Sequence, residues 1–133
     1  MRTPAVVYPC AISTLLVDDS DVFRQSLRRL LTKHFPTMQI DEAATGAEAM
    51  RKHREHELVF MDIRLPDSSG LELTRRLKAE NPATAVCVVT QFDMPEYREA
   101  ASRSGASGFM LKDGLTEQAL IGMVRTVLDE LKG

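Results

Sequence analysis

The stretch Ile12-Ser13-Thr14-Leu15-Leu16-Val17, followed directly by Asp18 and Asp19, decides the fold of this chain. An uncharged run rich in branched side chains is typical of a strand that is buried on both faces. A second run, Leu58-Val59-Phe60-Met61, ends in the same way at Asp62. Strands of this kind belong to parallel sheets covered by helices, and ligands bind at the carboxyl ends of such strands. The pattern therefore predicts an α/β fold with an acidic site at one edge of its sheet.

Apolar runs alternate with amphipathic stretches along the rest of the chain, which is typical of β–α units. Since the crossovers of such units are right-handed, five of them predict a five-stranded parallel sheet with helices on both faces. Further strands are expected at 38–43, on an edge of the sheet, at 85–89 and at 108–111. Helices are expected after Ser20, from Thr45 to about residue 55, from Ser69 to Asn81, over 94–104 with Gly105 at its end, and over 120–131.

The composition is that of a single globular domain. Apolar residues make up 44% and charged residues 27% of 133 residues, enough for one hydrophobic core. We expect the domain to span 12–133 and residues 1–11 to be an N-terminal extension. A net charge of −2 argues against nucleic-acid contact by the domain itself. No apolar stretch approaches the ~20 residues that cross a membrane. Two cysteines, Cys10 and Cys87, make no disulfide framework and favour a cytoplasmic location.

Polar side chains close four of the expected strands. Asp18 and Asp19 follow the first, Asp62 the third, Thr90 the fourth and Lys112 the fifth. Because the carboxyl ends of parallel strands lie at one edge of the sheet, we expect these side chains to converge. A carboxylate cluster of this kind is suited to Mg²⁺, which prefers oxygen ligands.

The convergent set is suited to phosphoryl transfer. The Asp62 carboxylate can attack phosphorus and form an acyl phosphate. Mg²⁺ bound by Asp18, Asp19 and Asp62 would neutralise phosphoryl oxygens. Lys112 would supply a further positive charge, and the Thr90 hydroxyl would donate a hydrogen bond.

These residues and their surroundings resemble the receiver domain of two-component response regulators. The matching stretches are Leu16–Ser20, Met61–Gly70 and Gly105–Asp113, with Thr90 between the last two. The resemblance implies the flavodoxin-like strand order 2-1-3-4-5. It implies that Asp62 is phosphorylated by a sensor histidine kinase, and that the chain catalyses only this transfer and its hydrolysis, so it is not otherwise an enzyme.

The same resemblance assigns roles to further residues. It implies direct Mg²⁺ ligands in Asp19, Asp62 and the Arg64 backbone carbonyl, with Asp18 bound through water. It makes Thr90 the switch hydroxyl and Phe109 the aromatic residue that changes rotamer with it. Arg64 and Phe92, each two residues beyond a site residue, border the site and are candidates for tuning hydrolysis of the acyl phosphate.

The stretch after Gly105 is most similar to receivers attached to LuxR-type DNA-binding domains. This favours the receiver part of a transcriptional regulator that forms a homodimer on phosphorylation. A single-domain regulator and a phosphorylation-independent binding module are alternatives.

Two positions depart from the family pattern. Gln91 follows Thr90 where a small residue is usual, and we predict slower phosphorylation or altered dephosphorylation relative to Gln91→Ala. Asp113 follows Lys112 where proline is common, so the peptide bond between them is expected to be trans.

Two other classes of protein share part of this pattern. An aspartyl phosphohydrolase of the haloacid dehalogenase kind requires an acid where Arg64 stands, and a flavin domain requires a phosphate loop where Asp18 and Asp19 stand. His53 and His56 have helical spacing for a metal, but their charged neighbours favour a solvent-exposed face.

Overall fold

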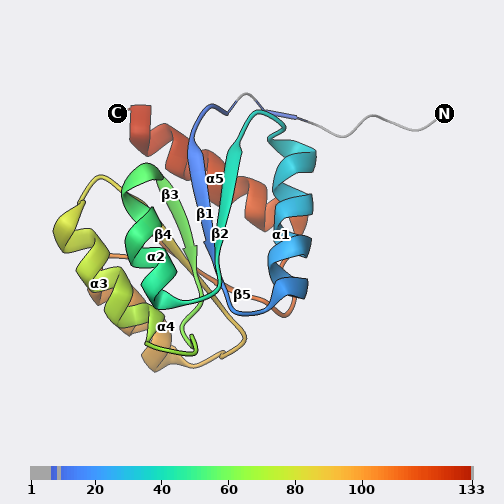
Figure 1. The fold of residues 1–133 in the computed structure, drawn as a ribbon. Helices are drawn as coiled ribbons and strands as arrows, with labels where there is room; N and C mark the ends of the chain where they lie inside the picture. Colours follow the sequence, from blue (N-terminus) through green and yellow to red (C-terminus); the bar gives the residue numbers. More distant parts are fainter. Residues whose placement is uncertain (1–6, 9, 133) are drawn as a thin grey trace.

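The structure, a computed structural model, describes residues 7, 8 and 10–132 of the chain. One parallel sheet with the order β2-β1-β3-β4-β5 forms its centre, which confirms the predicted topology and the edge position of the second strand (Figure 1). The strands are β1 (Ser13–Val17), β2 (Gln39–Ala43), β3 (Leu58–Met61), β4 (Ala85–Thr90) and β5 (Gly108–Leu111).

Helices cover both faces of this sheet. Helices α1 and α5 contact each other and cover one face, and α2, α3 and α4 cover the other (Figure 1). The three layers confirm the predicted fold class. The helical elements are α1 (Asp21–His34), α2 (Gly46–Lys52), the 3-10 turn η1 (His53–Glu55), α3 (Gly70–Glu80), α4 (Pro95–Arg103) and α5 (Glu117–Lys132).

Strand alternation divides the core into layers. On β1, Leu16 packs with Leu27 and Leu31 of α1, while Leu15 points to the opposite face and packs with Leu77 of α3. All residues of β3 and β4 are buried, because helices cover both of their faces. These two central strands therefore hold their carboxyl ends, which carry Asp62 and Thr90, in fixed positions.

The helix starts follow the predicted caps. The hydroxyls of Ser20, Thr45 and Ser69 each accept a hydrogen bond from a backbone N–H in the first turn of the helix that follows. Asp67, which was not predicted to have a role, adds a second cap to α2 by accepting from Gly46 N at 2.7 Å. At the end of α4, Gly105 has a φ of 98°, a conformation in which glycine is favoured.

Part of the expected N-terminal extension packs on the domain. Cys10 is 5% exposed, its N–H donates to Thr37 Oγ1 at 3.1 Å, and the Tyr8 ring lies 5.5 Å from that of Phe35. Residues 1–6 and 9 of the extension lie outside the described residues.

The prediction of a solvent-exposed face at His53 and His56 is wrong. His53 is fully buried and His56 is 9% exposed. The chain leaves α-helical geometry at His53 and forms the 3-10 turn, which directs this side chain inward. There His53 Nε2 lies 2.9 Å from Glu80 Oε2 at the end of α3. The charged residues next to His53 in the sequence give no indication of this contact.

Two smaller expectations concern the backbone. No cis peptide bond occurs in the part of the chain that the structure describes, so the bond between Lys112 and Asp113 is trans, as predicted. None of the described helices has the length and apolar character needed to span a membrane.

Candidate functional site

The carboxyl ends of β1 and β3 bring three carboxylates together. Oxygen atoms of Asp18, Asp19 and Asp62 lie within 4.8 Å of one another. Asp18 and Asp62 are each 6% exposed, whereas Asp19 is exposed. Since β1 and β3 are adjacent and in register from Thr14 onward, this proximity is fixed by the sheet itself.

Lys112, which follows β5, reaches across to this cluster. Its Nζ lies 2.6 Å from Asp18 Oδ2 and 3.1 Å from Asp62 Oδ2. Asp18 uses its other oxygen, Oδ1, to accept from Ser20 N at 2.9 Å. The lysine therefore bridges the two buried carboxylates, and one of them is anchored to the start of α1.

The buried charges shift one another's pKa. Burial raises the pKa of Asp62, the nearby Asp18 charge raises it further, and Lys112 only partly offsets this. Burial acts to lower the pKa of Lys112, but its contacts with Asp18 and Asp62 outweigh burial and raise it. Lys112 is thus held in its charged form, while the Asp62 carboxylate lacks full compensation. Such a carboxylate favours an additional cation.

Thr90 ends β4 beside this cluster and is fully buried. Its hydroxyl oxygen accepts from Phe92 N at 3.2 Å, and its carbonyl accepts from Lys112 N at 2.8 Å. The backbone of β4 therefore positions Lys112 directly. Gln91 has an exposed side chain at the rim, so its predicted effect on access to the site stays a prediction.

The loop after β3 places Arg64 and Phe92 against each other. The Arg64 guanidinium carbon lies 4.1 Å from the centre of the Phe92 ring. The bridge between Arg64 and Ser69 uses the carbonyls of Ile63 and Ser68, so it does not use the Arg64 carbonyl that is predicted to bind metal.

Gly70 fixes the other end of the same loop. A Cβ atom at this position would lie 1.8 Å from the Asp62 carbonyl oxygen, a distance that no side chain tolerates. Glycine is therefore required where α3 begins, and it sets the path of the backbone that carries Asp62.

Phe109, the predicted switch residue, lies on β5 and is half-buried. It packs against Ile63, Val88 and Ala101, and the Arg98 guanidinium carbon lies 4.7 Å from its ring centre. In this position the ring contacts both the loop after Asp62 and helix α4.

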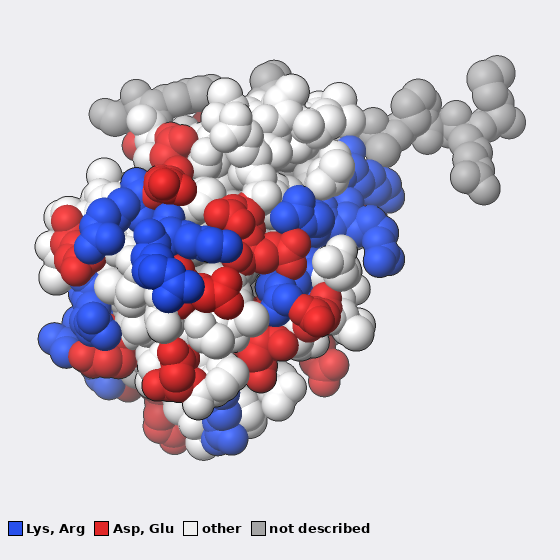
Figure 2. All heavy atoms as spheres, in the orientation of Figure 1, with Lys and Arg blue, Asp and Glu red and all other residues white. Residues whose placement is uncertain are grey.

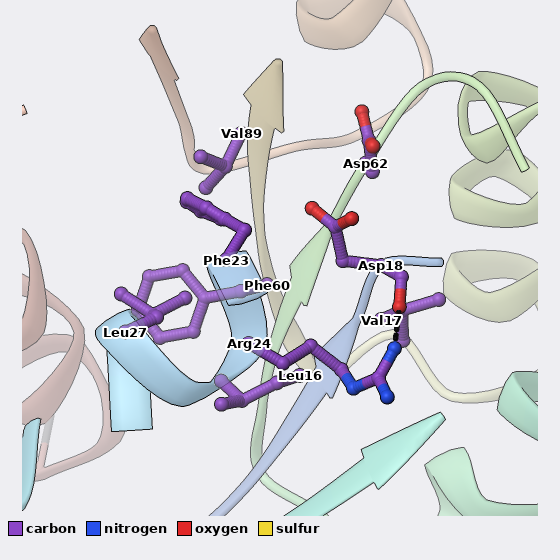
Figure 3. A pocket seen from close by; sticks show the side chains of 9 residues that line it. All are labelled: Leu16, Val17, Asp18, Phe23, Arg24, Leu27, Phe60, Asp62 and Val89. Carbon is purple, nitrogen blue, oxygen red and sulfur yellow. Dashed lines mark hydrogen bonds between the residues drawn. The ribbon is translucent and has the colours of Figure 1, made fainter. Parts of the chain in front are cut away.

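One residue of the site was not found from the sequence. Phe23, in the first turn of α1, lines the pocket with Asp18, Asp62 and Val89 (Figure 3). Its place three residues after the cap Ser20 indicated a helical apolar stripe and nothing more. The centre of its ring lies 4.5 Å from Lys112 Nζ, a contact between separate elements that no sequence pattern indicates.

The donor set fits a divalent cation. Three carboxylates balanced by one lysine leave excess negative charge in a largely buried site, and carboxylate oxygens are the ligands that Mg²⁺ prefers. Asp18, Asp19, Asp62 and the Arg64 carbonyl are the groups that would hold it.

Comparison with known proteins defines the class. Residues 14–125 match the model of the response regulator receiver domain. The chain therefore belongs to the receiver domains of two-component response regulators.

Two curated relatives illustrate the similarity. "Transcriptional regulatory protein LnrK" of Bacillus subtilis is 35% identical over 118 residues, which cover 87% of this chain and 53% of LnrK. "Chemotaxis protein CheY" of Halobacterium salinarum is 35% identical over 104 residues, which cover 77% of this chain and 85% of CheY. The chain spans about half the length of several of the curated regulators that it resembles, LnrK among them.

Solved structures agree with this assignment. A LuxR-family two-component response regulator from Aurantimonas sp. SI85-9A1 superposes with a TM-score of 0.82 at 29% identity, covering 91% of this chain and 87% of that one. A CheY-like receiver domain protein from Methanospirillum hungatei JF-1 gives 0.83 at 25% identity, covering 92% and 98%.

Proposed function

We propose that this domain is a phosphorylation-controlled switch that accepts a phosphoryl group on Asp62 from the phosphohistidine of a sensor histidine kinase. The observation that carries the proposal is the position of the Asp62 carboxylate. It lies at the end of a buried strand, 3.1 Å from the Lys112 ammonium and within an acid cluster.

The proposed reaction uses this geometry. An Asp62 oxygen attacks phosphorus and forms the O–P bond of an acyl phosphate, while the P–N bond breaks and its electron pair returns to the imidazole. Bound Mg²⁺, held by Asp18, Asp19, Asp62 and the Arg64 carbonyl, would neutralise charge on the phosphoryl oxygens. No proton has to leave Asp62, because the carboxylate is the reactive form.

Lys112 and Thr90 act on the product. Lys112 exchanges a carboxylate oxygen for a phosphoryl oxygen, since the Asp62 oxygens lose negative charge when the acyl phosphate forms. The Thr90 hydroxyl, which accepts from Phe92 N before the reaction, rotates to donate to the phosphoryl group. The peptide after Thr90 and the packing of Phe109 then change together.

The output is proposed to pass through α4, β5 and α5. The domain would be cytoplasmic and, as the name of its relative "Transcriptional regulatory protein LnrK" indicates for that protein, would be part of a regulator of transcription. It would form a homodimer when phosphorylated, and its catalysis would be limited to its own phosphorylation and hydrolysis.

The test is the intact mass of the protein after incubation with acetyl phosphate and Mg²⁺. We expect the mass of one added phosphoryl group on the wild type and none on Asp62→Asn. Asp93→Asn is the matched control, because it removes an exposed acid that does not belong to the carboxylate cluster. Modification that persists in Asp62→Asn would reject the proposal.

A further inference from the structure

We propose that Phe23 is a positioning residue for phosphoryl transfer and that its ring face holds the Lys112 ammonium in place while this group changes partners. The inference rests on the proposed function. It adds an aromatic residue of α1 to a site otherwise built from strand ends and the loops that follow them.

The contact is direct. Lys112 Nζ lies 4.5 Å from the centre of the Phe23 ring, within the range of a cation–π interaction. The same nitrogen lies 2.6 Å from Asp18 Oδ2 and 3.1 Å from Asp62 Oδ2. The ammonium is thus in contact with two carboxylates and one aromatic ring.

Local structure explains why the ring is there. Asp18 Oδ1 accepts from Ser20 N at 2.9 Å, and Ser20 Oγ accepts from Phe23 N at 3.2 Å. Asp18 therefore holds Lys112 with one oxygen and, through Ser20, fixes the first turn of α1 with the other. This turn presents the Phe23 side chain beside Asp18 and Asp62 at the end of the sheet (Figure 3).

During the reaction the two carboxylates change their partners, whereas the Phe23 ring keeps its contact with Lys112. Both carboxylates that hold Lys112 are proposed metal ligands, and Asp62 is also the nucleophile, so their hydrogen bonds to the ammonium must change as the phosphoryl group arrives. The Phe23 ring takes no part in that exchange. Attraction to a ring face also tolerates small displacements of a cation better than a directional hydrogen bond does. Phe23 therefore supplies the contact that keeps the flexible lysine close to the phosphoryl oxygens.

A purely structural role is the competing explanation, since Phe23 also packs against the core beside α1. Phe23→Leu keeps an apolar side chain and removes the ring, whereas Phe23→Tyr keeps the ring. We expect Phe23→Leu to slow phosphorylation by acetyl phosphate at saturating Mg²⁺ by about 3- to 10-fold, and Phe23→Tyr to stay within about twofold of the wild type. The half-saturating Mg²⁺ concentration should change by less than about twofold in both, because the ring offers no ligand atom to the metal and its cation–π contact is with Lys112.

Tyr8→Leu is the matched control. It removes an aromatic ring that lies 4.8 Å from the Arg125 guanidinium carbon, a comparable contact. Tyr8 N donates to the carbonyl of His34 at the far end of α1, about 16 Å from Phe23 along the helix axis. The phosphorylation rate of Tyr8→Leu should equal that of the wild type.

Fluorinated phenylalanines at position 23 decide between ring electrostatics and packing. Each added fluorine weakens attraction to a cation with little change in shape, so the logarithm of the rate should fall steadily from zero to three fluorines. A flat series, or a Phe23→Leu rate equal to the wild type, would overturn the inference while leaving the proposed function intact. A wild type that takes no phosphoryl group on Asp62 would overturn both.

Discussion

The two edges of the sheet are held in place in different ways. At the β2 edge, charged side chains bind the backbone carbonyls of the strand, whereas at the β5 edge little buried surface joins the strand to helix α4. At the β2 edge, Arg28 donates to the carbonyl of Ile40 at 3.1 Å, and Lys52 donates to the carbonyl of Glu42 at 2.7 Å. Arg24 Nε and Arg28 Nε also hold the two Glu42 oxygens at 2.8 and 2.9 Å. Figure 2 shows acidic and basic side chains interleaved over this face.

The β5 edge is built differently. Every residue of β5 is half-buried, and Ala101 is the single buried residue of α4. Among residues 7, 8 and 10–131, no ion pair joins α4 to another element; Arg103 pairs only with Glu99, within the helix. The contact between Arg98 of α4 and the Phe109 ring of β5 joins the helix to the strand within this edge.

This contrast indicates which edge of the domain can change its packing at a low cost in free energy. The β2 edge is fixed by several linked charges and by the apolar side of α1, so it can open only when much of the domain unfolds. The β5 edge buries little surface and can therefore repack more easily. The site lies between the two edges and contacts both, through Arg24 and Asp18 on one side and through Thr90 and Phe109 on the other. We therefore expect phosphorylation to be transmitted to the β5 edge.

The largest effect should come from the core at the α1 side. Leu31→Ala removes a fully buried side chain and should lower the free energy of unfolding by about 2–5 kcal/mol. Tyr97→Ala truncates a half-buried ring on α4 and should cost only about 1 kcal/mol. Urea unfolding followed by circular dichroism measures both. Equal losses would contradict the contrast between the two edges.

Removing an acid of the site should reduce the stabilisation by Mg²⁺, whereas removing an acid of the β2 edge should not. Mg²⁺ at about 100 times its Kd should stabilise the wild type by about 2.7 kcal/mol, because it binds the folded state alone. Asp62→Asn should lose much of this gain by removing a ligand. Asp41→Asn is the control, since Asp41 already pairs with Lys52 at 3.2 Å. Thermal unfolding with and without Mg²⁺ tests this, and an equal gain in Asp62→Asn would count against the metal site.

Breaking the charge network should weaken the β2 edge at neutral pH. Glu42→Gln removes the buried-side carboxylate of Arg24, which is 9% exposed and keeps only the exposed Asp21 as an acidic partner, and should cost about 2 kcal/mol. Although burial acts to raise the pKa of Glu42, Arg24 and Arg28 outweigh it and lower the pKa below 4.5. A lowered folded-state pKa means that this stabilisation is present above about pH 4.5 and is lost as the pH falls through the folded-state value. Unfolding measured across acidic pH should show a shallower decline in Glu42→Gln than in the wild type.

The smallest effect is expected at the rim. Gln91→Ala should phosphorylate up to about threefold faster than the wild type, because a small residue beside Thr90 opens the approach to Asp62; this corresponds to about 0.7 kcal/mol. Rates with acetyl phosphate and with a smaller donor such as phosphoramidate would separate access from chemistry. Identical phosphorylation rates in the wild type and Gln91→Ala would show that Gln91 does not limit access to Asp62.

Much of the fold could be predicted because its signals are local. The uncharged run at 85–89 indicated a strand buried on both faces, and Ser20, Thr45 and Ser69 each begin a helix where the capping rules place one. The convergence of Asp18, Asp62 and Lys112 also followed, since parallel strands end at one edge of the sheet.

The remainder depends on tertiary contacts. Nothing near His53 in the sequence indicates that a 3-10 turn directs it toward Glu80, and its charged neighbours favour exposure. The burial of Cys10 against Thr37, and the contact of Phe23 with Lys112, join segments that no spacing rule connects. Side-chain contacts between separate elements are therefore what the sequence alone could not supply.

Reduction with borohydride can locate the phosphoryl group that Asp62 is proposed to accept. Borohydride reduces an acyl phosphate to the alcohol with release of phosphate, which converts a phosphorylated aspartate to homoserine. After treatment with acetyl phosphate and Mg²⁺, peptide mapping should find homoserine at position 62 of the wild type. Homoserine at another acid, or at none while the intact protein carries the added mass, would contradict the account.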